Sequence, residues 1–319
     1  MSRLWPSGSR AALLAVVALA ATPVLGGSAG PAAAPRDALS YVALGDSYAS
    51  GFGAGSYTDG CGRSPLGLPG LLDGGEQVDL IADGTCAGAR VITDPGAAGD
   101  RRDLPEQVAQ TVADGALSTG TDLVSISAGG NDAGFGEVAA VCASQPPAIC
   151  SEVIAARNTT SLPALAGALD ALYADIRVAA PAATVLVTGY PHLFSPAFGD
   201  EVIPLASQEA FNTGTDGLNT VIRERAEAAG FVFVDLVPAF DGHGLGSPSP
   251  WITLRAGASD NLHPTAEGYR DGYYPAVRRT VDLDRLQRRH PGDRPRAALT
   301  GSPDAARDAR PGGGASCIA

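Results

Sequence analysis

Four short apolar runs divide the middle of the chain. They are continuous rather than alternating, and most of their residues are Val, Ile, Leu, Phe or Ala. Continuous apolar runs of this length are typical of strands that are buried on both faces of a parallel sheet. We therefore expect strands at Ser40–Leu44, Asp122–Ser127, Thr184–Thr188 and Phe231–Asp235.

Longer segments with apolar residues at helical spacing separate these runs. After Leu162, for example, apolar residues recur every three or four positions as far as Ile176, which predicts an amphipathic helix. The expected helices are Leu104–Leu117, Leu162–Val178, Gln208–Ala229 and Ala266–Val281. Alternating strands and helices predict a doubly wound α/β fold with right-handed crossovers. In such a fold the ligand site lies beyond the carboxyl ends of the strands.

The first residues differ in character from the rest of the chain. Arg3 and Arg10 precede an apolar run, Ala11–Leu25, which is followed by small residues. This order is that of a secretory signal peptide, and the run is short for a membrane span, which needs about 20 apolar residues. We assign residues 1–35 to a signal peptide and expect no stable membrane insertion after its cleavage. An uncleaved membrane anchor is the alternative.

The last residues are rich in Arg, Pro, Gly and Ala and poor in large apolar side chains. Such a segment buries too little surface to offset its ordering entropy, so residues 285–319 are expected to form a disordered tail. Residues 36–284 remain between the two ends. Their number suits one α/β domain.

Charge narrows the range of partners. The net charge is −12, and all 22 basic residues are Arg. Phosphate binding requires a basic face, so a nucleic-acid partner is not expected. The acidic surface favours a soluble protein outside the cell, and we expect a monomer.

Five cysteines fit an exported protein with disulfides. Two disulfides by proximity are Cys61–Cys86 and Cys142–Cys150, although four cysteines permit three connectivities; Cys317 is left over. A zinc site is disfavoured because there is no Cys-x-x-Cys pair. The segments Cys61–Leu72 and Cys142–Cys150 are interpreted as long surface loops that border a cleft.

A candidate nucleophile follows the first predicted strand. Gly45-Asp46-Ser47 comes directly after Leu44, and Gly51 follows shortly. A sharp turn there would present the Ser47 hydroxyl at the carboxyl edge of the sheet, as nucleophilic catalysis requires. Ser28 lies in a Gly-x-Ser-x-Gly motif, but it falls in the expected cleavage zone and has no strand before it. We reject it.

A base for this serine must be sought among four histidines. His290 lies in the expected tail, whereas His192 and His243 lie in loops. His263 immediately precedes Pro264, a residue that suits the first turn of a helix, so it would lie beside the sheet edge. Asp260, three residues earlier, could accept a hydrogen bond from the imidazole and fix its tautomer.

Two further positions could supply hydrogen-bond donors to a developing oxyanion. Asn131 follows the second predicted strand within Gly129-Gly130-Asn131-Asp132, and its amide could point into the same crevice. One such donor contributes about 3 kcal/mol; the alternative is a simple turn former. Gly88 permits close approach of a backbone N–H.

Taken together, these motifs resemble the four blocks of the SGNH (GDSL) hydrolase family, and they occur in the same order over about 220 residues. The chain is most similar to the secreted, disulfide-bearing bacterial lipase/esterase branch, including Cys86–Ala89 and Pro250-Trp251-Ile252. The resemblance implies a flavodoxin-like three-layer α/β/α sandwich around a central parallel sheet. A third disulfide that is frequent in that branch is absent here, since no cysteine lies near Gly244–Gly246.

The resemblance also implies the roles of the site residues. Ser47 would be the nucleophile and His263 the base, and the oxyanion hole would consist of the Ser47 N–H, the Gly88 N–H and the Asn131 side chain. Asp260 would complete a triad, although some relatives orient the histidine with a backbone carbonyl. No metal or organic cofactor is implied.

The expected activity is hydrolysis of a small-molecule or lipid ester by a secreted lipase or carboxylesterase. An apolar cleft could be lined by five residues near the nucleophile, which could equally be core residues: Phe52, Tyr57, Leu66, Leu68 and Leu71. A carbohydrate O-acetyl esterase or an acyltransferase would use the same machinery. A non-catalytic secreted binding protein is the alternative from another class.

Overall fold

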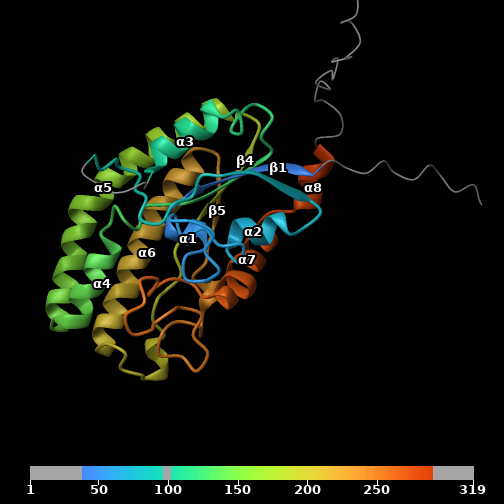
Figure 1. Cartoon of the computed structure of the whole chain (residues 1–319). Helices are drawn as coiled ribbons and strands as arrows, with labels where there is room; N and C mark the ends of the chain where they lie inside the picture. The colour runs from blue at the N-terminus through green and yellow to red at the C-terminus, as the bar shows by residue number, and fades with distance from the viewer. Residues whose placement is uncertain (1–37, 96–101, 290–319) are drawn as a thin grey trace, which may run out of the picture. The chain divides into compact units, whose positions relative to one another are not determined.

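A parallel five-stranded sheet lies at the centre of the folded domain (Figure 1). The computed structural model describes residues 38–95 and 102–289. The sheet order is β2-β1-β3-β4-β5, which is the order of flavodoxin-like folds. The strands are β1 (Leu39–Gly45), β2 (Val78–Asp83), β3 (Leu123–Ser127), β4 (Thr184–Thr188) and β5 (Val232–Val234).

Helices cover both faces of this sheet, so the domain has three layers. On one face α5 packs against α3 and α6, and these two helices contact the strands (Figure 1). On the other face α2 and α7 contact the strands, and a π-helical turn packs against both helices (Figure 1). The helices are α1 (Ser47–Ser50), α2 (Leu68–Asp73), α3 (Leu104–Ala113), α4 (Phe135–Ser144), α5 (Pro147–Ala179), α6 (Leu205–Ala228), the π-helical turn Gly268–Tyr273, α7 (Tyr274–Thr280) and α8 (Leu283–Arg289). Short 3-10 turns lie at Pro196–Phe198 and Pro238–Phe240. The expected α/β/α sandwich is confirmed.

All four strands predicted from the apolar runs are present, each within two residues of its expected ends. The prediction omitted β2, whose sequence is Val-Asp-Leu-Ile-Ala-Asp and whose burial is partial. β2 is an edge strand that pairs only with β1. A half-exposed edge strand carries polar residues, so it lacks the continuous apolar run that marked the others.

The helices differ more from their predicted bounds, and α5 differs most. It begins at Pro147, not at Leu162, and it runs through Pro163. Proline is common in the first turn of a helix, so a pattern with Pro163 as its second residue resembles a beginning rather than an interior. The prediction of a loop at Cys142–Cys150 is wrong, because most of this segment is helical.

The C-terminal boundary also differs from the prediction. Helix α8 extends to Arg289, past the expected start of the tail at residue 285, and it buries Leu283 and Leu286. The rest of the expected tail, with Cys317, and the expected signal peptide lie outside the described residues. No helix in residues 38–95 and 102–289 is both long and apolar enough to cross a membrane.

Among the described residues two disulfides are formed, with the connectivity expected from proximity: Cys61–Cys86 and Cys142–Cys150. The second joins α4 to the first turn of α5. Both cross-link nearby residues, and such bonds stabilise a fold chiefly by restricting the unfolded chain. Cys61–Cys86 ties the loop after α1 to the segment that follows β2.

Gly45 ends β1 and turns the chain toward Ser47. Its φ is +135°, a conformation that side chains disfavour. A Cβ atom on Gly45 would lie 2.3 Å from the carbonyl oxygen of Ser127 on β3. The side-chain amide of Gln107 on α3 holds this turn, since it accepts from Gly45 N at 2.8 Å and donates to Gly45 O at 2.9 Å.

We predict that Gly45→Ala lowers the free energy of unfolding by about 1–3 kcal/mol, because it adds both backbone strain and a contact with a strand that cannot move. Urea denaturation measures this change. Gly167→Ala is the control, since Gly167 lies within α5 and a Cβ there meets no atom within 4 Å. That variant is expected to be as stable as the natural protein or about 1 kcal/mol more stable. Equal stabilities of the two variants would contradict the prediction.

Candidate active site

Ser47 is the first residue of α1, directly beyond the carboxyl end of β1. Asp46 caps this helix, because its carboxylate accepts a hydrogen bond from Tyr48 N at 2.9 Å. Gly51, with a positive φ of 85°, ends it after one turn. The first N–H groups of a helix have no acceptor within the helix. The Ser47 N–H is therefore oriented for an external acceptor.

His263, which lies near the C-terminal end of the domain, contacts this serine. Its Nε2 lies 2.7 Å from Ser47 Oγ, and its Nδ1 lies 2.8 Å from the carbonyl oxygen of Asn261. A carbonyl only accepts hydrogen bonds, so Nδ1 carries the proton and Nε2 is left as an acceptor for the hydroxyl. The pair therefore has the polarity that a nucleophile and its general base require.

Two aromatic rings flank the imidazole. The ring centroids of Tyr48 and Phe52 lie 4.9 Å and 5.1 Å from that of His263. Burial lowers the pKa of His263 below its ordinary value of 6.5, and the Asn261 carbonyl only partly offsets this effect. Desolvation disfavours the charged imidazolium, so the imidazole is neutral at pH 7.

The loop that carries His263 is fixed by its neighbours. Leu262 has φ of +65°, which is unfavourable for a branched side chain. Its N–H donates to Thr253 O at 2.8 Å, and its carbonyl accepts from the Tyr48 hydroxyl at 2.5 Å. Tyr48 thus holds the histidine loop directly against the helix that bears Ser47.

The carboxylate of Asp260 is not the hydrogen-bond partner of His263. It accepts from the Tyr57 hydroxyl at 2.5 Å and from the Arg255 guanidinium at 2.8 Å. The left-handed Leu262 folds the chain so that the Asn261 carbonyl takes the Nδ1 position instead. This differs from the expected arrangement, in which the Asp260 side chain orients the imidazole.

The electrostatics of Asp260 agree with this pairing. Burial alone would raise the pKa of the carboxyl group, but the Tyr57 hydrogen bond and the Arg255 charge outweigh burial and lower it below its ordinary value. Asp260 is therefore ionised at neutral pH. Its negative charge favours protonation of His263, so it acts on the imidazole through space.

Gly88 and Asn131 face the same cavity as Ser47 and His263, and this cavity has a volume of about 240 Å³. Asn131 follows β3, and its Nδ2 donates to Ala89 O at 2.9 Å. Gly88 has φ of +83°, where glycine is the favoured residue. The structure thus brings together Ser47, Gly88, Asn131 and His263.

Asp132 anchors the Gly88 segment to the end of β3, a role that the sequence did not reveal. Its carboxylate accepts from Val91 N at 3.0 Å and from Ile92 N at 2.8 Å. Burial raises the pKa of Asp132, and these two hydrogen bonds oppose the rise. The side chains of Asn131 and Asp132 together therefore hold residues 89–92.

Tyr190 links the two sides of the cleft and was also missed. Its hydroxyl donates to Asp46 at 2.5 Å and accepts from Gly130 N at 2.9 Å. Burial raises the pKa of Asp46 to about 7, although the hydrogen bonds from Tyr190 and Tyr48 oppose the rise. Tyr190 follows β4, and that position at the sheet edge is the only signal that could have indicated it.

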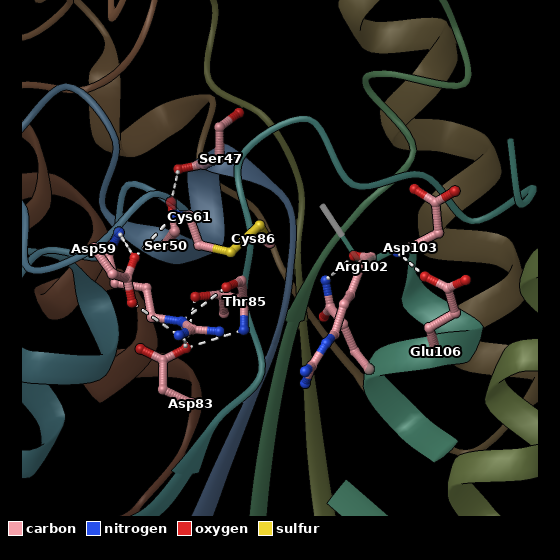
Figure 2. Close-up of a disulfide and its surroundings, with 12 residues drawn as sticks. Ser47, Ser50, Asp59, Cys61, Asp83, Thr85, Cys86, Arg102, Asp103 and Glu106 are labelled. Atoms are coloured by element: carbon pink, nitrogen blue, oxygen red, sulfur yellow. Dashed lines mark hydrogen bonds and ion pairs between the residues drawn. A yellow bond between two sulfur atoms is a disulfide. The ribbon is translucent and has the colours of Figure 1, made fainter. Parts of the chain in front are cut away.

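The Cys61–Cys86 disulfide lies beside this site. Figure 2 shows the disulfide close to Ser47 and Ser50 of α1, with Asp59, Asp83 and Thr85 nearby. Arg63 Nε donates to Thr85 O at 2.9 Å, and its guanidinium pairs with Asp59 at 2.9 Å. These contacts fix the segment that leads to Gly88.

The other candidates from the sequence lie elsewhere. His192 pairs with Asp216 at 2.7 Å, and His243 stacks on Trp251 with ring centroids 3.5 Å apart. Ser28 and His290 lie outside the described residues. Within residues 38–95 and 102–289, no group of three or more His, Cys, Asp or Glu side chains could hold a metal ion.

Of the residues expected to line an apolar cleft, Phe52 lines the cavity. Tyr57 is held by Asp260. Leu68 is a core residue, Leu71 packs against the core, and Leu66 is exposed. The wall of the cavity near Asn131 comes instead from α4, a helix that was not expected from the sequence.

Comparison with known proteins agrees with this geometry. Residues 43–270 match the GDSL-like Lipase/Acylhydrolase family. Lipase 1 of Streptomyces coelicolor is 39% identical over 83% of this chain and 95% of its own length, and a lipase of Streptomyces rimosus is 36% identical over 84% and 97%. The chain belongs to the GDSL-like lipase/acylhydrolase family.

Solved structures of the family superpose on this chain. The crystal structure of the extracellular lipase of Streptomyces rimosus matches with a TM-score of 0.66 at 35% identity, covering 76% of this chain and 100% of that one. A phospholipase A1 of Streptomyces albidoflavus NA297 gives a TM-score of 0.66 at 33% identity, with coverage of 76% and 100%. This GDSL family member is therefore an ester hydrolase.

We predict that the His263 imidazole titrates below its ordinary pKa of 6.5, because burial disfavours the charged form. The neutral imidazole is therefore present above that pKa and is lost as the pH falls through it. NMR titration of the imidazole protons, assigned by comparison with His263→Ala, measures the midpoint. A midpoint at or above 6.5 would show that burial is not the dominant influence on this group.

Proposed function

We propose that this protein is a secreted lipase or carboxylesterase in which Ser47 is the nucleophile and His263 the general base. The observation that carries the proposal is the 2.7 Å contact between Ser47 Oγ and His263 Nε2 at the cavity that Gly88 and Asn131 also line. A serine at the start of a helix, a base with its acceptor nitrogen toward it, and nearby donors are the parts that acyl transfer requires.

In the first step, His263 Nε2 accepts the Ser47 proton while Oγ forms a bond to the ester carbonyl carbon. The carbonyl oxygen gains negative charge, which we assign to the Ser47 N–H, the Gly88 N–H and an N–H of the Asn131 amide. The other amide N–H is directed to Ala89 O. Each such donor contributes about 3–4 kcal/mol to the transition state.

The intermediate then breaks its bond to the leaving alkoxide. The imidazolium of His263 gives its proton to that oxygen, so that the alcohol departs and an acyl-Ser47 ester remains. A water molecule repeats the sequence: His263 accepts its proton, the hydroxide oxygen bonds to the acyl carbon, and Ser47 Oγ recovers the proton as the carboxylic acid leaves.

We propose that the Asn261 carbonyl, not the Asp260 carboxylate, orients His263. The carbonyl fixes the proton on Nδ1 and supports the imidazolium that forms in each step. Asp260 is a positioning residue through Tyr57, whose hydroxyl also accepts from Gly53 N at 2.9 Å. Gly53 packs directly against His263, since a Cβ there would lie 2.7 Å from the His263 Cβ.

The near-neutral pKa of Asp46 fits this mechanism. The carboxyl group caps the helix that bears Ser47, so its charge lies close to the oxygen that becomes an oxyanion. A partly protonated Asp46 opposes that charge less than a fully ionised carboxylate would. Tyr190 and Tyr48 keep the group hydrogen-bonded in either state.

Several findings support a secreted enzyme that acts on acyl esters of lipids. Two disulfides are typical of oxidising compartments. A signal peptide is expected for residues 1–35, and the related Streptomyces rimosus protein is an extracellular lipase. Relatives are named lipase and phospholipase A1, and the cavity has apolar walls at Phe52, Phe135 and Leu262. A monomer remains a prediction.

We predict that Ser47→Ala lowers kcat for nitrophenyl butanoate by at least about 10³-fold and leaves the unfolding temperature nearly unchanged, because only the nucleophile is removed. Ser50→Ala is the control: Ser50 lies on the same short helix and is also buried, but it does not line the cavity. It should keep its activity within about tenfold and should be labelled by a fluorophosphonate at Ser47.

Activity in Ser47→Ala equal to that of the control would contradict the assignment. Absence of both turnover and fluorophosphonate labelling in the natural protein would indicate the non-catalytic binding protein instead. A panel of nitrophenyl esters, a phospholipid and acetylated xylan separates a lipase from an O-acetyl esterase. Transfer of the acyl group to an added alcohol, in preference to water, would identify an acyltransferase.

A further inference from the structure

A second cavity lies between α4, α5 and α6, next to the catalytic cleft. Its volume is about 40 Å³, and the three helices that enclose it pack against one another. Most of its lining is apolar: Phe135, Val138, Ile154, Leu162, Phe211 and Leu218. The nucleophile, the base and the oxyanion donors proposed above have no part in it.

Phe135 separates the two cavities. It is the first residue of α4, and it lines both of them. Its ring centroid lies 6.2 Å from that of Tyr48 and 6.1 Å from that of Tyr190, which both line the catalytic cleft. Its ring centroid lies 4.9 Å from that of Phe211, which lines the second cavity. One half-buried side chain therefore forms the wall between them.

Polar groups occur at the outer end of the second cavity. The Arg157 guanidinium pairs with Glu137 at 2.5 Å, so its charge is balanced within the rim. Asn158 is exposed, which places this end of the cavity at the surface. A mostly apolar cavity with a neutralised polar rim suits a hydrocarbon chain rather than a charged or sugar ligand.

We propose that this cavity is the distal subsite for the acyl chain of the substrate and that Phe135 determines how long a chain it accepts. The inference rests on the proposed function, since the chain must be attached to the carbonyl group held at Ser47. The acyl chain leaves the cleft past Phe135 and places its terminal methylene groups among the residues of α4, α5 and α6. The cavity has room for only the end of a chain.

The test is a chain-length series of nitrophenyl esters from butanoate to tetradecanoate, assayed below their micelle concentrations. Burying one methylene group favours a complex by about fourfold. Phe135→Ala joins the two cavities, so the ratio of kcat/KM for dodecanoate to that for butanoate should rise at least about tenfold. Phe135→Leu, which perturbs the fold less, should raise it by a smaller factor.

Gly214 offers the opposite change. It lies on α6 and lines the second cavity but not the cleft. A Cβ on Gly214 would lie 3.0 Å from Cγ2 of Ile154, which also lines the cavity. Gly214→Leu would therefore fill this space, so it should lower the dodecanoate-to-butanoate ratio and cancel the gain in the double variant with Phe135→Ala. Phe198→Ala is the matched control, since Phe198 is 52% exposed and lines neither cavity; its ratio should be unchanged.

The outcomes separate this inference from the function on which it rests. An unchanged ratio in Phe135→Ala, Phe135→Leu and Gly214→Leu, with butanoate still hydrolysed, would overturn the subsite and leave the esterase assignment intact. A gain in Phe135→Ala that Gly214→Leu does not cancel would also overturn it, because the longer chain would then lie elsewhere. Failure of the natural protein to hydrolyse any ester would refute the proposed function itself.

Discussion

The 2.7 Å hydrogen bond between Ser47 Oγ and His263 Nε2 joins residues that are 216 positions apart, and the rest of the site is arranged around it. It requires two unusual backbone conformations, φ of +135° at Gly45 and of +65° at Leu262. Such conformations persist only where their surroundings over-determine them. Gln107 holds the first turn, and the Tyr48 hydroxyl ties the second to the helix that bears Ser47.

Burial sets the charge states of this site. It keeps the His263 imidazole neutral and raises the pKa of Asp46 to about 7, so both groups beside Ser47 carry less charge than they would in water. Asp260 is ionised, but its carboxylate pairs with Arg255 and does not contact His263. A carbonyl contact at His263 Nδ1 adds no second buried charge, and burying an extra charge is costly.

The sequence was most informative where one physical cause acts alone. Continuous apolar runs predicted β1, β3, β4 and β5. The positions of Ser47, Asn131 and His263 relative to these strands and the helices indicated that the three residues lie at one edge of the sheet. It was least informative where tertiary contacts decide. Pro163 lies within a helix because packing of α5 against α6 outweighs the unfavourable propensity of proline for helix interiors. Tyr190 has a role only because β4 brings it beside Asp46. The partner of His263 depended on the left-handed Leu262, which no pattern of residue types indicates.

The orientation of His263 by a backbone carbonyl is the central claim, and the kinetics of Asp260→Asn test it most directly. An orienting carboxylate in a Ser-His-Asp triad contributes about 10⁴-fold to kcat. Because the Asp260 side chain bonds to Tyr57 and Arg255 instead, its replacement should lower kcat for nitrophenyl butanoate by less than about tenfold. The Tyr57→Phe variant should give a loss of similar size. A loss near 10⁴-fold in Asp260→Asn alone, with the fold intact, would contradict the account.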